Sequence, residues 1–241
     1  MGTKPAEALR PPEGSDPIPD LLEDALGLSV LSPSFYVQKF CESIFGVNPW
    51  DWAAEQLSGD WDGVKRAGDA VHNLAAYNAA VGASIRDGIE ALDGSWHGAA
   101  ADSARRYFDD LAKSVARQEG PLKDIGMQMD QLAIAMYELS KAVGDALSSI
   151  TDKAIIALVE IAAGEMLIAS GFGAAAAAGS FALAALQVTE MLAKWNAILD
   201  HWTKTWSTVQ ALMAGIVGTA AGAEFVDLPP LPQTAYTHPG A

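Results

Sequence analysis

The chain has 241 residues, half of them hydrophobic, which is enough for one sizeable core or two small ones and excludes a disordered protein. Acidic residues outnumber basic ones by 30 to 15, giving a formal net charge of -15. The clustered Lys and Arg that phosphate neutralisation requires are therefore missing, which argues against nucleic acid as a partner. The single cysteine, Cys41, excludes an internal disulfide and a multi-cysteine metal site. Its apolar neighbours Phe40, Ile44 and Phe45 predict a buried, structural thiol.

The first segment, residues 1–20, is rich in proline and acidic residues. Such a composition buries too little apolar area to offset its ordering entropy, so we expect a disordered acidic leader with ordered structure from near Leu21. The segment also lacks a continuous apolar run, so we do not expect a secretory signal peptide here. A protein that leaves the cell without one must use another route.

Two short helices are predicted next. Phe35 to Phe45 forms a helical pattern, and Asn48-Pro49 then supplies an N-cap and a first-turn proline for a helix through Leu57. Ser58-Gly59 ends that helix.

A long helical hairpin is predicted after these elements. From Trp61 to Leu92, apolar residues recur at steps of three and four, and the same spacing resumes over residues 98–150. Gly120-Pro121 interrupts the second stretch and should kink or restart the helix, because the apolar stripe keeps its phase across it. The pattern predicts an all-α fold built on an elongated antiparallel hairpin.

The turn of this hairpin is Gly94-Ser95-Trp96-His97-Gly98. Glycines on both sides allow a tight reversal, and we expect the Trp96 indole to fold over the helix ends and plug the core there.

The turn also carries a family resemblance. Trp96-x-Gly98, a following run of small residues and the segment Tyr107-Phe108-Asp109-Asp110 resemble the WXG (ESAT-like) substrates of type VII (ESX) secretion, in the actinobacterial type with an extended C-terminal helical region. The resemblance covers about residues 50–150. The turn and secretion motif of the family corresponds to Trp96 and Gly98 alone. A second Trp-x-Gly, at Trp61, stands at the start of the first long helix instead.

The resemblance implies a protein exported by the type VII machinery without a cleaved signal peptide, cytoplasmic before export and then secreted or associated with the cell envelope. It also implies assembly with itself or with a small WXG-type partner. Many family members carry a Tyr-x-x-x-acid signal, but Tyr77, Tyr107 and Tyr137 are followed four residues later by Val, Leu and Lys. This departure would place the signal on a partner chain, or would favour a cytosolic scaffold that is not exported.

Beyond residue 152 the composition changes to Ala, Gly and Ile. Residues 166–188 carry no charge and are long enough to cross a bilayer, but they are mostly alanine and glycine, which makes spanning marginal. We favour a second helical pair that turns near 171–179, with contact to a membrane as the alternative. Small residues would allow its two helices to pack closely, among them Gly164, Gly171, Gly173 and Gly179.

The last helical pattern runs from Phe181 to Ile216 and places three tryptophans, Trp195, Trp202 and Trp206, on one face. We expect this face to pack against the first hairpin; the alternative is an interaction face for a membrane or a partner. Beyond residue 222 a Pro-rich tail follows.

No catalytic, metal or cofactor site is predicted. The four histidines are scattered without metal-ligand spacing, and the acid pairs Asp109-Asp110 and Glu160/Glu165 read as solvated helix faces. The expected organisation is a leader (1–20), a WXG-like hairpin region (21–152), an Ala/Gly-rich helical pair (153–222) and a tail (223–241), together resembling a four-helix bundle. The expected function is non-enzymatic binding by an ESX substrate. A membrane-active effector that inserts residues 153–222 and a cytosolic helical scaffold remain as alternatives.

Overall fold

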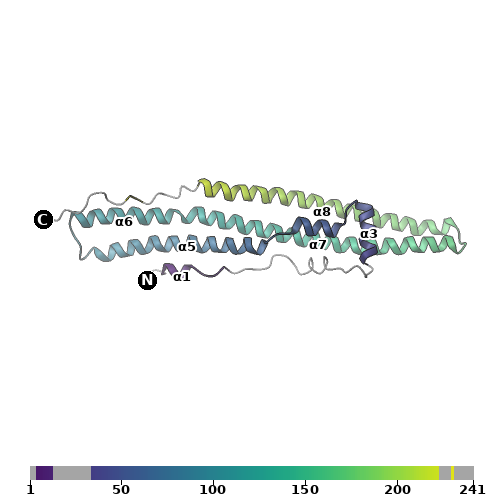
Figure 1. Cartoon of the computed structure of the whole chain (residues 1–241), viewed down its shortest axis with the longest axis horizontal. Coiled ribbons are helices and arrows are strands. Elements are labelled where there is room, and N and C mark those ends of the chain that lie inside the picture. The colour runs from purple at the N-terminus through teal and green to yellow at the C-terminus, as the bar shows by residue number, and fades with distance from the viewer. Residues whose placement is uncertain (1–3, 13–33, 223–228, 231–241) are drawn as a thin grey trace. The chain divides into compact units, whose positions relative to one another are not determined.

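A computed structural model describes residues 4–12, 34–222 and 229–230, and within them the chain is all-α, without a strand. The all-helical prediction is confirmed. Figure 1 shows the order of the elements, which are α1 (Pro5–Ala8), α3 (Ser34–Phe45), α4 (Pro49–Leu57), α5 (Trp61–Leu92), α6 (Ala99–Arg117), α7 (Glu119–Ala169) and α8 (Ala174–Gly222).

The chain divides into two compact units. Unit 1 comprises the described parts of residues 1–15, 62–133 and 210–241, and unit 2 those of residues 16–61 and 134–209. The helices α7 and α8 therefore each contribute to both units. The predicted boundary between residues 152 and 153 lies inside α7, so the change in composition there does not coincide with the end of a helix.

In unit 1, α5 runs antiparallel to α6 and to the first turns of α7. Asn78 Nδ2 donates to Gln118 Oε1 at 2.9 Å, and His72 pairs with Asp130 at 2.9 Å. The earlier α5 residue thus contacts the later residue of the other arm, which is the order of an antiparallel pair. The backbones approach most closely at Gly82, where an added Cβ would lie 2.9 Å from the Ala112 carbonyl oxygen. Only glycine fits this contact without a shift of the neighbouring helix.

The break between α6 and α7 lies where the sequence predicts it. The helix α6 ends at Arg117, Gln118 forms a turn, and α7 begins at Glu119. Pro121 then falls in the first turn of α7, where its missing N–H removes no intrahelical hydrogen bond.

The leader is only partly as predicted. Residues 5–8 form the short helix α1, and Asn73 Nδ2 donates to the Arg10 carbonyl at 3.0 Å, so the expectation of disorder is wrong for these residues. Residues 1–3 and 13–20 of the leader, the expected start of order near Leu21 and nearly all of the predicted tail lie outside the described residues.

In unit 2, α7 and α8 form an antiparallel pair joined by a turn at residues 170–173. Lys153 forms an ion pair with Glu190, and the Phe181 ring lies against Gly164. The predicted cap of α4 is confirmed, because Asn48 Oδ1 accepts from Trp50 N at 3.0 Å. Buried residues of this unit come from α3, α4, α7 and α8 and include Val37, Cys41, Trp50, Leu57, Leu139, Val143, Leu147, Ile150, Met191 and Ile198.

Candidate interaction sites

The predicted motif residues Trp96 and Gly98 lie in the turn between α5 and α6. Gly98 has a φ of +99° and occupies the N-cap of α6, which explains the glycine, since other residues are strained there. The Trp96 side chain is 40% exposed, and every residue from 91 to 100 is exposed. The expectation that Trp96 plugs a core is therefore wrong, because the indole stays partly open to solvent and its neighbours in the turn are all exposed.

Arg105 holds the Trp96 turn. Its guanidinium donates to the Trp96 carbonyl at 3.1 Å and to Asp102 Oδ1 at 3.0 Å, and it also pairs with Asp93. One side chain thus ties the end of α5 and the turn to the first turn of α6. The hairpin pattern does not predict this role of Arg105, although the spacing of Asp102 and Arg105 on one helix is a usable signal.

The second Trp-x-Gly begins α5, as predicted, and its tryptophan has a different setting. Trp61 Nε1 donates to the Leu57 carbonyl at 3.0 Å, and an added Cβ at Gly59 would lie 2.7 Å from the indole. Trp61 therefore ties the end of α4 to the start of α5.

The tryptophan face of α8 is mostly covered by the chain itself. Trp195 is 6% exposed, stacks on Phe45 of α3 at 5.4 Å between ring centroids and meets Trp52 of α4 edge-on at 5.2 Å. Trp202 also contacts Trp52, and its ring stacks parallel to Trp206. Packing is thus the role of this face, as predicted, and its partners are Phe45 of α3 and Trp52 of α4, both within the predicted hairpin region 21–152. Of the three predicted face residues, Trp206 is the one that remains exposed, at 36%.

The predicted close-packing glycines have different roles. Gly164 does pack closely, since an added Cβ would lie 2.7 Å from the Phe181 ring. At Gly171, Gly173 and Gly179 an added Cβ would meet nothing within 4 Å, so the prediction is wrong for these three. Gly171 and Gly173 have φ values of +83° and +86°, which explains their glycines by the turn.

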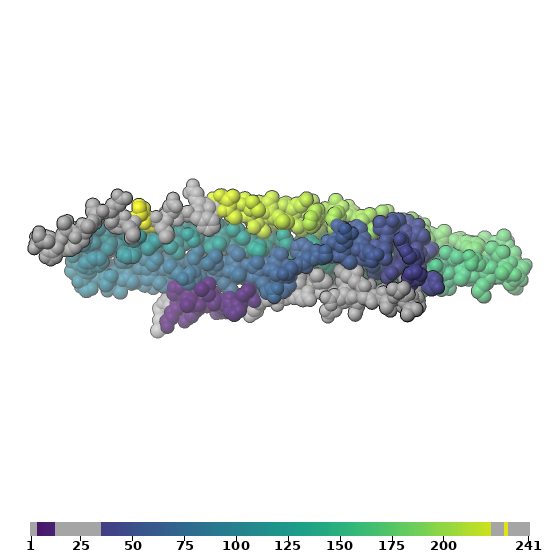
Figure 2. All heavy atoms as spheres, viewed as in Figure 1, coloured from purple at the N-terminus to yellow at the C-terminus, as the bar shows by residue number. Residues whose placement is uncertain are grey.

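Apolar side chains are exposed around the α7–α8 turn in unit 2. In Figure 2 the green atoms of this region extend beyond α3 without another described segment on the face in view. The helix α8 contains a stretch long and apolar enough to span a membrane by length and composition, and 17% of it is buried. We call the exposed set the apolar tip; it consists of Ile155, Ile156, Val159, Met166, Ile168, Phe172, Phe181, Leu183 and Leu186.

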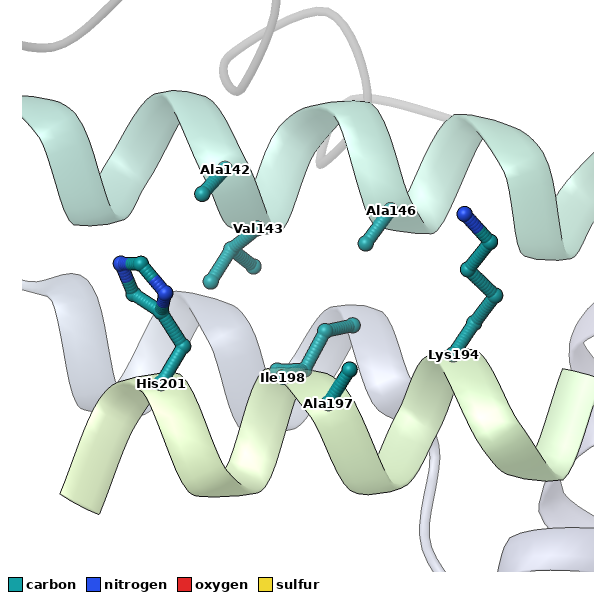
Figure 3. Close-up of a pocket in the computed structure, with 7 residues that line it drawn as sticks. All are labelled: Ala142, Val143, Ala146, Lys194, Ala197, Ile198 and His201. Carbon is teal, nitrogen blue, oxygen red and sulfur yellow. The ribbon is translucent and has the colours of Figure 1, made fainter. Parts of the chain in front are cut away.

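A pocket of about 170 Å³ lies between α7 and α8, also in unit 2. Figure 3 shows Val143 and Ile198 pointing toward one another across it, with Lys194 and His201 at its two ends. The remaining lining residues are Ala142, Ala146 and Ala197.

Four ionisable side chains of α5 and α7 form a cluster in unit 1. Asp130 accepts from Lys65 at 3.1 Å and pairs with His72, and Lys65 also donates to Asp69 at 2.7 Å. The hydrogen bond to Asp69 is the main reason that the pKa of Lys65 is raised. Among the described residues, no three His, Cys, Asp or Glu side chains are grouped to hold a metal ion.

The other predicted positions are placed as follows. Cys41 is fully buried, as predicted, and burial raises the pKa of its thiol to about 12. Within the described part of the chain, His97 and His201 are exposed and take part in no ion pair, and Asp109 and Asp110 lie on the solvent side of α6. His238 lies outside the described residues.

Neither a protein-family model, nor a curated protein, nor a solved structure matches this chain.

Proposed function

We propose that this protein is a non-enzymatic, secreted interaction protein that a type VII export machine recognises through the Trp96 turn, and that it assembles with a helical partner or with itself. One observation supports the proposal most strongly. The Trp96 indole is exposed at a turn that is fixed by Arg105 and by the positive φ of Gly98.

An exposed indole on a rigid turn is suited to recognition. Tryptophan contributes a large contact area, and few rotatable bonds have to be ordered when it binds. The three Arg105 contacts order the turn before a partner arrives, which lowers the entropy lost on binding. The resemblance to WXG substrates supplies the identity of the proposed receptor, the export machinery.

Export assays on matched tryptophan variants test the proposal. Trp96→Ala should abolish secretion with little loss of thermal stability, because the side chain is exposed. Trp61→Ala, which loses the hydrogen bond to Leu57, should lower stability but retain secretion at a permissive temperature. The unaltered chain should stay in the cytoplasm when the export ATPase is deleted. Secretion that survives both Trp96→Ala and loss of the ATPase would contradict the proposal and favour a cytosolic or otherwise exported scaffold.

A membrane-active role is the second candidate, and the apolar tip favours it. At 100° per residue, Met166 and Ile168 lie on opposite sides of α7, yet both are exposed. A protein partner covers one side of a helix, whereas lipid surrounds it. Exposure on both sides is therefore better matched by hydrocarbon than by a single protein surface.

Flotation with vesicles separates this candidate from the first. A membrane-active protein should float with phosphatidylcholine–phosphatidylglycerol vesicles, and Leu183→Glu should abolish flotation because a carboxylate in hydrocarbon is costly. Ile134→Glu, at an exposed apolar position of α7 outside the apolar tip, is the matched control and should still float. Failure of the unaltered protein to float would remove this candidate and leave the export proposal intact.

A further inference from the structure

The pocket between α7 and α8 has the size of one side chain. Its volume of about 170 Å³ lies below the range of roughly 300–1,000 Å³ that small-molecule sites occupy. Its floor is apolar, formed by Val143 and Ile198 with three alanines around them. A single Leu, Met or Phe side chain from another molecule would fill it and remove its apolar surface from water.

Two polar groups stand at the ends of this pocket. Lys194 and His201 are seven residues apart on α8, so they share a side of the helix and lie about 10 Å apart along its axis. Six lysines of the described chain have an acidic partner within 4.0 Å, whereas Lys194, like Lys4 and Lys141, has none, although acidic residues are twice as numerous as basic ones. The pocket thus presents an unpaired ammonium at one end and an imidazole at the other.

We propose that this pocket, bounded by Lys194 and His201, docks an acidic amphipathic helix of a partner protein. One apolar side chain of that helix enters the pocket. Carboxylates about one turn before and one turn after it pair with the Lys194 ammonium and accept a hydrogen bond from His201. The inference rests on the proposed role in protein interaction and names the surface and the partner chemistry, but it does not depend on export.

The same pocket on a second copy is a poor occupant. Two concave surfaces placed face to face leave both pockets unfilled, and the lining contains no carboxylate for the other copy's Lys194. Docking of a different surface of a second copy would be head-to-tail and would produce rings or open chains. Self-association through this pocket can therefore be distinguished from the binding of a partner helix.

A defined peptide tests the inference on the full-length protein. The probe is a labelled Ala/Gln-based peptide of about 18 residues, long enough to be partly helical, with a central Leu flanked by Glu four residues before and three residues after. Fluorescence anisotropy at low salt should show saturable binding. Replacing both Glu with Gln, or the Leu with Ala, should each weaken binding about tenfold, because each removes one half of the recognition.

Matched protein variants locate the site. Lys194→Glu should weaken peptide binding at least tenfold, whereas Lys141→Glu, which makes the same charge change at an exposed α7 position outside the pocket, should change it less than about twofold. Ala146→Leu should fill the pocket and also weaken binding. Both Lys positions are exposed, so both charge variants should retain the helical circular dichroism spectrum.

Several results would overturn the inference. No binding by the unaltered protein, equal weakening by Lys141→Glu, or undiminished binding by Ala146→Leu would each remove the pocket as the site. Concentration-dependent self-association that Lys194→Glu abolishes, seen by sedimentation, would assign the pocket to a second copy instead. If the peptide does not bind but export still depends on Trp96, the pocket is rejected and the export proposal stands. If the peptide binds but export does not depend on Trp96, the export proposal is rejected and the pocket stands.

Discussion

Cys41 shows how burial alone sets the chemistry of a residue. Its side chain has no exposed area, and desolvation raises the pKa of the thiol from 9.0 to about 12. The folded state therefore keeps the thiol neutral at pH values where the unfolded chain releases its proton. Such a cysteine is a packing residue and a poor nucleophile while the protein is folded.

A pH dependence of stability follows from this raised pKa. Below pH 9 the thiol is protonated in both states and has no effect, and above pH 9 the unfolded state gains stability by ionising. The free energy of unfolding should therefore fall by about 1.4 kcal/mol by pH 10, beyond what other groups cause, and continue to fall toward pH 12. Urea denaturation of the unaltered protein and of Cys41→Ala across pH 7–10 measures the difference. Parallel pH profiles for the two proteins would contradict the assignment.

Asp130 is the residue that links α5 to α7 by charge. Asp130→Asn removes a carboxylate that both Lys65 and His72 contact, and each of these side chains is about one-third exposed. We expect a loss of about 1 kcal/mol, since partly exposed pairs are weak individually and this one involves two partners. Asp69→Asn, which removes only the pair within α5, should cost less than half as much. Equal losses of stability in the two variants, measured by thermal denaturation, would show that the contact between α5 and α7 adds nothing to the stability.

At the scale of the element, two glycines of α5 make opposite predictions. Gly82→Ala places a Cβ 2.9 Å from the Ala112 carbonyl and should destabilise by about 1–2 kcal/mol. Gly88→Ala meets nothing within 4 Å and should stabilise by about 0.5–1 kcal/mol through helix propensity. Thermal denaturation of both variants gives the signs directly, and stabilisation by both would refute the close approach of α5 to α6.

The helices were the features that the sequence could predict. Spacing of three and four residues identified α5, α7 and α8, and local chemistry placed the Asn48 cap and the restart of α7 before Pro121. These signals act within one or two turns, so a single sequence contains all the information they need. The helix α7 continues through Thr151, whose hydroxyl donates to the Leu147 carbonyl, so the polar pair Thr151-Asp152 is not a helix boundary.

The candidate sites depended on contacts that a single sequence does not contain. How far Trp96 is covered depends on tertiary contacts at the hairpin end, where the described chain leaves it 40% exposed. The partners of Trp195 are supplied by Phe45 and Trp52, about 150 residues earlier in the chain. The glycines of the α7–α8 turn were read as packing residues, although the positive φ at Gly171 and Gly173 is what requires them.

At the scale of the whole chain, the charge imbalance opposes compactness. A net charge of -15 produces repulsion between acidic surfaces, while the ion pairs are mostly exposed and weak. Raising NaCl from low to physiological concentration should therefore raise the midpoint of thermal unfolding by roughly 2–5 °C, because screening relieves the repulsion. Sucrose at matched osmolality separates screening from general exclusion effects. A fall of the midpoint with salt would show that attractive pairs dominate.

The distribution of aromatic residues gives each unit its own optical signal. The chain has seven tryptophans, and all of them except Trp96 belong to unit 2. The parallel rings of Trp202 and Trp206 should couple as excitons and add a near-ultraviolet dichroism band that unit 1 cannot produce. In a Trp96→Phe variant the whole indole emission therefore reports on unit 2, while the backbone signal reports on both units. Because α7 and α8 run through both, the two melting curves of that variant should superimpose, and any temperature gap between them measures how independently the units unfold.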